Sequence, residues 1–134
     1  MSRNLISDDA LNAARLALDG LSLRQQVISR NLANVDTPGY RAQQVKFEDT
    51  LKQVFQRKKG VELEKSHQAH LASPARRAGF QVSQRPGGSL RADLNSVDID
   101  VELLEMNETG IQYQALTQSV SKKLALLKTI AMSR

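Results

Sequence analysis

The chain contains no cysteine and no tryptophan, and its 134 residues include only three phenylalanines and two tyrosines. The absence of cysteine excludes a disulfide framework, a thiolate metal site and a cysteine nucleophile. No apolar run approaches the roughly 18 residues that span a bilayer, and the N-terminal sequence lacks the hydrophobic core of a secretory signal. Because large aromatic anchors are scarce, the apolar content is mainly Leu, Ala, Val and Ile, which favours helix packing over a sandwich or barrel.

The net charge of +5 is concentrated in the middle of the chain. Residues 41–95 carry eleven basic and five acidic side chains, whereas residues 1–40 are balanced and residues 96–134 carry four basic and five acidic ones. The basic runs at 57–59 and 76–77 are suited to phosphate contacts, but no groove-reading element or stacking aromatic accompanies them. We therefore expect a solvated surface and no nucleic-acid partner, with a basic coiled-coil nucleic-acid binder as the alternative.

The first strong pattern is a heptad repeat from residue 7 to residue 33. Its apolar residues alternate by three and four positions, which keeps one stripe of a helix facing a partner helix. Ser7 is placed to cap this helix, and Gly20 is expected to weaken it by about 1 kcal/mol relative to Ala. With Gln25 as a polar interruption, the predicted seam consists of Leu11, Ala14, Leu18, Leu21, Ile28 and Leu32.

A second heptad repeat runs from residue 97 to residue 132. Acidic residues crowd its first half and lysines its second half, which complements the helix dipole. Asn95 or Ser96 is the expected cap, and Gly110 falls on the seam, where it allows close approach, allows a bend or is simply tolerated. Besides glycine, threonine and alanine, the seam contains Ile99, Leu103, Met106, Tyr113, Val120, Leu124 and Leu127.

Two long heptad helices at the two ends of a short chain predict a mainly α fold. We expect them to pair as an antiparallel coiled coil, with a short irregular, β-containing middle segment between them. The chain then divides into an N-terminal helix and turn (1–40), a partly flexible connector (41–95) and a C-terminal helix (96–134). A helical hairpin in an ordinary bundle has the same periodicity and stays open as an alternative.

The connector begins with a turn and then loses its pattern. Residues 34–40 end the first helix, and Pro38 and Gly39 occupy the central positions that a type II turn favours. Residues 45–58 have the spacing of a short amphipathic helix, and residues 61–64 alternate as in a short strand. From 66 to 96, prolines and glycines predict loop, or a segment that becomes ordered only in a complex.

No arrangement of residues supports catalysis or a cofactor. His67 and His70, with Glu64 upstream, supply too few ligands for zinc, so solvated polar residues are the simpler interpretation. Asp98 and Asp100 resemble a metal-binding pair, but they lie where they complement a helix dipole. No phosphate loop, nucleophile motif or paired carboxylates are recognisable, and we expect neither an enzyme nor a metal nor a cofactor.

The segment at the end of the first helix resembles a known signature. Residues 31–40 read NLANVDTPGY, which is similar to the signature of bacterial flagellar rod and hook proteins. Residues 41–51, 97–100 and 113–117 resemble the FlgB family of proximal rod proteins, although residues 91–96 read RADLNS where that family often has a Gly-Asn-rich entry to the last helix. The positions that carry the signature turn are Asn31, Asn34, Thr37, Pro38, Gly39 and Tyr40.

The resemblance implies a structural subunit of the flagellar basal body rod. Such subunits assemble helically in the periplasm, link the MS ring and export gate to the distal rod, and transmit torque for motility. They leave the cell through the flagellar type III export apparatus without a cleaved signal peptide. The implied partners are further copies of the chain, other rod proteins, the MS-ring and rod-junction proteins and the export apparatus, with no direct membrane insertion. Another rod protein of the same family is the nearer alternative.

Overall fold

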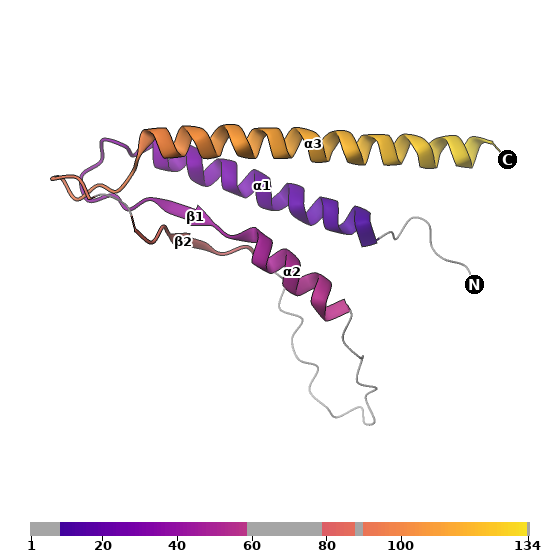
Figure 1. Ribbon diagram of the computed structural model, residues 1–134, viewed down its shortest axis with the longest axis horizontal. Helices are drawn as coiled ribbons and strands as arrows, with labels where there is room; N and C mark the ends of the chain where they lie inside the picture. The colour runs from indigo at the N-terminus through magenta and orange to yellow at the C-terminus, as the bar shows by residue number, and fades with distance from the viewer. Residues whose placement is uncertain (1–8, 59–78, 88–89, 134) are drawn as a thin grey trace, which may run out of the picture.

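The structure is a computed structural model that describes residues 9–58, 79–87 and 90–133. In chain order, its elements are α1 (Asp9–Ala33), β1 (Gln43–Val45), α2 (Phe47–Lys58), β2 (Val82–Gln84) and α3 (Ile99–Met132). Figure 1 shows α1 and α3 side by side and antiparallel, with α1 between α3 and the layer made by the two strands and α2. The expected mainly α fold with a small β-containing middle is therefore confirmed.

The two long helices differ in length. α1 has 25 residues and α3 has 34, which correspond to about 38 Å and about 51 Å at a rise of 1.5 Å per residue. The end of α1 lies beside the start of α3, and Figure 1 shows the last turns of α3 extending past the start of α1. Much of the C-terminal half of α3 therefore lacks an intramolecular partner among the described elements.

The two strands change the predicted connector in two places: at the start of its helix and within its predicted loop. The helix predicted from residue 45 begins at Phe47, because residues 43–45 form β1 and pair with β2 as an antiparallel two-stranded sheet. The prediction of loop throughout 66–96 is wrong at β2 for the same reason: its backbone bonds to a distant strand, in the register Gln43↔Gln84, Gln44↔Ser83 and Val45↔Val82. The strand predicted at 61–64, the Ser7 cap and the residues Glu64, His67 and His70 lie outside the described residues.

The N-cap of α3 is Asp98, and the prediction of Asn95 or Ser96 is wrong. A side-chain oxygen of Asp98 accepts hydrogen bonds from the backbone nitrogens of Asp100 and Val101, at 3.0 Å and 3.4 Å. Asn95 and Ser96 do not cap the helix because their side-chain oxygens accept from other backbone nitrogens: Oδ1 of Asn95 from Val97, which precedes the helix, and Oγ of Ser96 from the distant Ala42. The interpretation of Asp98 as a residue that stabilises the helix start is confirmed.

Phe47 occupies the centre of the hydrophobic core. The edge of the Phe80 ring meets it, with the ring centroids 6.2 Å apart and the planes at 84°. The guanidinium carbon of Arg24 lies 4.5 Å from the centroid of the Phe47 ring, a distance that allows cation–π attraction. The apolar side chains around this ring are Leu21, Val27 and Val45, with Leu23 and Leu116 packed at the margin.

Gly20 is the point at which α1 approaches this ring. A Cβ atom at position 20 would lie 2.5 Å from Cγ and 2.8 Å from Cβ of Phe47. We expect Gly20→Ala to lower the free energy of unfolding by about 1–3 kcal/mol because the ring has to move, although Ala is otherwise better than Gly in a helix interior by about 1 kcal/mol.

Gly110→Ala is the matched control for this prediction, because a Cβ atom there meets nothing within 4 Å. That substitution should raise the free energy of unfolding. Urea denaturation measures both variants, and a Gly20→Ala protein as stable as Gly110→Ala would contradict the close packing of α1 on Phe47.

Candidate functional site

Asn31, at the C-terminal end of α1, connects four parts of the fold. It is fully buried, and its Nδ2 donates to the carbonyl oxygen of Gln43 at 2.8 Å and to Oε1 of Glu102 at 3.0 Å. Its Oδ1 accepts from the backbone nitrogen of Gln43 at 3.0 Å and from the hydroxyl of Tyr40 at 3.2 Å. One side chain thereby joins α1 to the turn, to β1 and to α3, and both donors and both acceptor sites of its amide are used.

Asn95 makes the matching connection from the entry to α3. Its Nδ2 donates to the carbonyl oxygens of Asn34, Val35 and Thr37 at 2.9, 3.0 and 2.9 Å, and its Oδ1 accepts from the backbone nitrogen of Val97 at 2.7 Å. Carbonyl groups that follow a helix end have no intrahelical partner. Asn95, which is fully buried, adds a second donor to these carbonyl groups, which also accept from the nitrogen of Thr37, Nη1 of Arg91 and the nitrogen of Tyr40.

The turn itself has the expected geometry. Gly39 has a φ of +73°, which a type II turn requires at its third position, and the nitrogen of Tyr40 donates to the carbonyl of Thr37 at 3.3 Å. The nitrogen of Gly39 also donates to the carbonyl of Asp93 at 2.8 Å. Next to Asp93, Leu94 has a φ of +64°, in the left-handed region.

Glu102 is a buried carboxylate on the face of α3 that meets α1. Its Oε1 lies 3.0 Å from Nη1 of Arg85, and Nη2 of Arg85 reaches Oε2 of Glu105 at 2.7 Å. Oε2 of Glu102 has no hydrogen-bond partner within the described part of the chain. Burial raises the pKa of Glu102 from its ordinary value of 4.5, while the hydrogen bond from Asn31 and the charge of Arg85 act in the opposite direction. Burial also raises the pKa of Tyr40.

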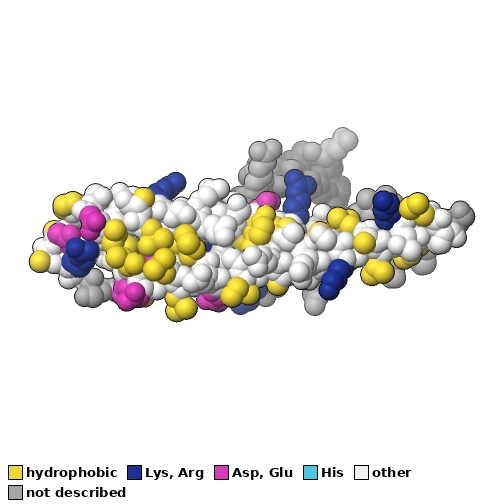
Figure 2. Space-filling view, turned by 90° about the horizontal axis from the view of Figure 1, so that it is seen from above, with side chains coloured by type: hydrophobic (Ala, Val, Ile, Leu, Met, Phe, Trp, Pro, Cys, Tyr) yellow, Lys and Arg dark blue, Asp and Glu magenta, His cyan; other side chains and the backbone are white. Residues whose placement is uncertain are grey.

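The structure divides the predicted seam residues into two groups. Leu21 and Ile28 are buried, and Leu11, Ala14, Leu18, Leu32, Met106, Val120 and Leu127 are half-buried. The other four lie on the outside of α3, with exposed fractions of 47%, 46%, 38% and 51% for Ile99, Leu103, Tyr113 and Leu124. Figure 2, which looks onto the molecule from above, shows hydrophobic side chains gathered at the surface toward one end.

The face of α3 that meets α1 carries residues that the sequence prediction missed. Glu102 and Thr109 are buried there, and Leu116 packs against the core. These three positions are seven residues apart, which is the spacing of a coiled-coil position. A heptad pattern that admits polar residues therefore identifies this inner face. A pattern restricted to apolar residues identifies the neighbouring stripe of α3 instead.

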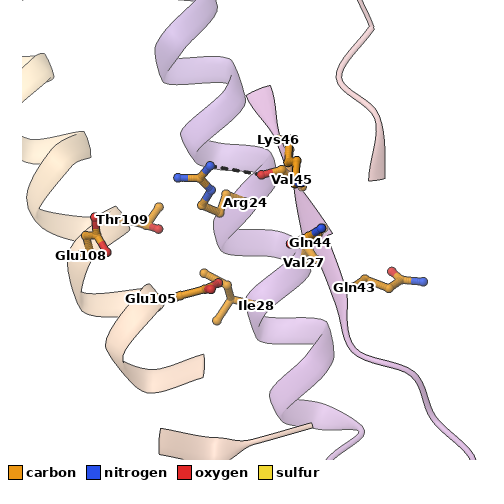
Figure 3. Close-up of a pocket in the computed structure, with 10 residues that line it drawn as sticks. All are labelled: Arg24, Val27, Ile28, Gln43, Gln44, Val45, Lys46, Glu105, Glu108 and Thr109. Atoms are coloured by element: carbon orange, nitrogen blue, oxygen red, sulfur yellow. Dashed lines mark hydrogen bonds between the residues drawn. The ribbon is translucent and has the colours of Figure 1, made fainter. Parts of the chain in front are cut away.

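A cavity of about 210 Å³ lies where α1, β1 and α3 meet (Figure 3). Arg24 projects beside it and donates to the carbonyl oxygen of Val45 at 3.1 Å. From α3, Glu105, Glu108 and Thr109 line the cavity. The part of the chain that the structure describes holds no group of three or more His, Asp or Glu side chains that could bind a metal ion.

The family described as "Flagella basal body rod protein" matches residues 9–41, which contain α1 and the signature turn. The flagellar basal body rod protein FlgB of Bacillus subtilis (strain 168) is 32% identical, over 85% of this chain and 86% of that protein. FlgB of Escherichia coli (strain K12) is 30% identical, over 94% and 95% of the two chains. The chain belongs to the FlgB family.

As a member of the FlgB family, the chain is a structural subunit of the proximal rod of the flagellar basal body and not an enzyme. The signature residues have structural roles: Asn31 is buried at the meeting point of the elements, and Asn34 donates to the carbonyl of Arg30 at 2.8 Å. None of the described helices is long and apolar enough to cross a membrane.

The raised pKa of Glu102 gives a prediction for stability against pH. Because the folded protein holds the Glu102 proton more tightly than the unfolded chain, protonation of Glu102 favours folding, and this contribution is lost as the pH rises through the raised pKa. The substitution Glu102→Gln removes this pH-dependent contribution to stability, because glutamine does not titrate. We expect the free energy of unfolding of the unmodified protein, minus that of Glu102→Gln, to increase as the pH falls from about 7 toward 4.5. Urea denaturation at a series of pH values measures this difference, and one that is constant or decreases toward acid pH would contradict the assignment.

Asn95→Ala tests the connection between the turn and α3. Removing the amide leaves three carbonyl groups and the nitrogen of Val97 without this partner. The three carbonyl groups keep second donors in the nitrogen of Thr37, Nη1 of Arg91 and the nitrogen of Tyr40. The main cost is the buried nitrogen of Val97, and because a buried unpaired group costs about 1–3 kcal/mol, we expect a loss of about 1–3 kcal/mol in the free energy of unfolding. Asn107→Ala, at an exposed position of α3, is the control and should change stability little. A loss below about 1 kcal/mol for Asn95→Ala would show that water replaces the amide.

Proposed function

We propose that copies of this chain assemble helically into the proximal rod by packing the outer surface of α3 against their neighbours. The observation that carries the proposal is the amount of large apolar surface that this helix exposes. Ten of its large hydrophobic side chains are at least 38% exposed: Ile99, Val101, Leu103, Leu104, Ile111, Tyr113, Leu124, Leu126, Ile130 and Met132.

Exposure on this scale is unfavourable for a single copy in water. Burial of apolar surface contributes about 25 cal/mol per Å², and extended apolar patches on a soluble protein mark interaction surfaces. Leu104 and Ile111, for example, are each 68% exposed although they lie seven residues apart on one side of α3. Contact with neighbouring copies would remove this surface from water, and the assembly would thereby gain its stability.

Within each copy, we infer that α1 and α3 are paired as an antiparallel coiled coil. The burial of Leu21 and Ile28, seven residues apart on α1, supports this pairing. On α3, the inward positions Glu102, Thr109 and Leu116 follow the same interval. This intramolecular pair would form the unit that the rod repeats.

Membership of the family supports a proposal for the partners and location of the chain. As a proximal rod subunit, the chain would contact other rod proteins, the MS-ring protein and a rod-junction protein, linking the MS ring and export gate to the distal rod and transmitting torque. It would reach the periplasm through the flagellar type III export apparatus without a cleaved signal peptide.

Deletion and complementation test this function directly. Deleting the gene in the source bacterium should abolish motility, a plasmid copy should restore it, and a tagged copy should be recovered with purified basal bodies. Full motility after deletion, or a tagged protein absent from basal bodies of complemented cells, would overturn the proposal.

Leu124→Asp tests whether the exposed apolar surface of α3 is used in assembly. Leu124 is 51% exposed in the single copy, so a charge there should leave folding intact but should be costly when a neighbour covers it. We expect no motility and no incorporation into basal bodies, with the helical circular dichroism of the purified protein unchanged. The control is Gln118→Asp, which adds the same charge at an exposed polar position of α3; motility of Leu124→Asp equal to that of this control would exclude Leu124 from the interface.

A further inference from the structure

α3 has two distinct faces, and only one of them has a partner within the described chain. The inner face, with Glu102, Thr109 and Leu116, meets α1 and the core. The apolar heptad lies roughly 80° around the helix at 100° per residue, and its N-terminal part is here named the outer stripe: Ile99, Leu103, Met106, Gly110 and Tyr113. A heptad stripe is the pattern by which one helix packs along another, so the outer stripe has the form of a docking surface for a second helix.

Gly110, at the centre of the outer stripe, has no function in the single copy. A Cβ atom there would meet nothing within 4 Å, and its φ is not in the left-handed region. Glycine in the interior of a helix is unfavourable relative to alanine. A glycine is useful at such a position where another backbone approaches closely, and within the described chain no other backbone does so.

The charges on α3 indicate which helix docks there. Residues 99–110 contain four acidic side chains and no basic one, whereas residues 111–132 contain three lysines and no acidic one. Asp100 and Glu108 are exposed in the first part, as are Lys122 and Lys128 in the second. Two parallel copies of α3 in register would place like charges together, whereas parallel copies displaced along the axis place the acidic half beside the basic half. An antiparallel pair also matches the charges, but it closes as a dimer and does not continue into a rod.

We propose that the outer stripe of one copy receives the C-terminal half of α3 from the next copy, with the two helices parallel and displaced by about 30 Å along their axes. This rests on the proposed function, because it names the contact by which rod subunits join. Gly110 lies at the closest approach, and the exposed Leu126 and Ile130, four residues apart on one side of the helix, supply the apolar side chains that cover the stripe. A contact between different surfaces of identical copies continues indefinitely and builds an open helical array.

The cysteine-free sequence allows a direct test by disulfide cross-linking. A tagged chain carrying both Met106→Cys and Leu126→Cys, which lie 20 residues or about 30 Å apart along the helix, replaces the chromosomal copy, and basal bodies are oxidised and separated without reductant. We expect a ladder of trimers and larger species, because each copy joins two neighbours, and no cross-link with either single variant. Closed dimers alone would indicate an antiparallel pair, and cross-linking by a single variant would indicate helices in register; either result, or no cross-link, overturns the proposal.

Gly110→Leu supplies the second readout, with Gln118→Leu as the matched control at an exposed position away from the stripe. The side chain at 110 should leave the melting temperature of the purified chain unchanged or higher, yet abolish both motility and the ladder. Normal motility of Gly110→Leu would overturn the close approach. If the unmodified chain restores motility but the ladder is absent, this inference fails and the proposed function stands; if the unmodified chain does not restore motility, the proposed function itself fails.

Discussion

The hydrogen bond between Asn31 and Glu102 is the interaction on which the rest of the structure depends. It joins residues 71 positions apart, and both side chains are fully buried. Because a buried polar group without a partner is costly, α1 and α3 have one favourable setting relative to each other. The same asparagine holds β1 through Gln43, and the same glutamate lies against Arg85, which follows β2. Helices and strands therefore share one polar centre.

The signature segment is best understood as the part that brings this centre together. Gly39, with its positive φ, allows the chain to reverse direction, and the hydroxyl of Tyr40 then donates a hydrogen bond to Oδ1 of Asn31. Nδ2 of Asn95, just before α3, donates hydrogen bonds to three carbonyl groups of the turn and so connects the turn to the start of α3. The region that the family model matches, residues 9–41, therefore contains α1 and the turn that connect to β1 and α3. This agrees with a structural role for the protein.

Elements whose sequence pattern repeats over many residues could be predicted, whereas short elements with distant partners could not. Both long helices were predictable because their periodicity extends over many turns. The turn was predictable because Pro38 fixes its own φ and Gly39 permits the positive φ that the next position of the turn requires. The two strands were not, because three residues carry no period and their pairing depends on a partner far along the chain. Glu102 and Asn95 were missed as buried residues because a charged or amide side chain reads as a surface residue until its distant partner is known. On α3, the apolar stripe that the sequence shows and the stripe buried against α1 are different faces, so periodicity alone did not identify the buried one.

The placement of Glu102 and Thr109 on the inner face has a consequence for how the subunit behaves alone. A rotation of α3 that turned Leu103 toward α1 would hide apolar surface, but it would carry Glu102 away from Asn31 and Arg85. The polar centre thus fixes the rotational phase of the helix and prevents the molecule from folding its hydrophobic stripe inward. The apolar stripe of α3 therefore stays exposed in the single subunit, which is less stable than it would be with the stripe buried. In the proposed assembly, burial of this stripe against a neighbouring copy would contribute that free energy to the contact between subunits.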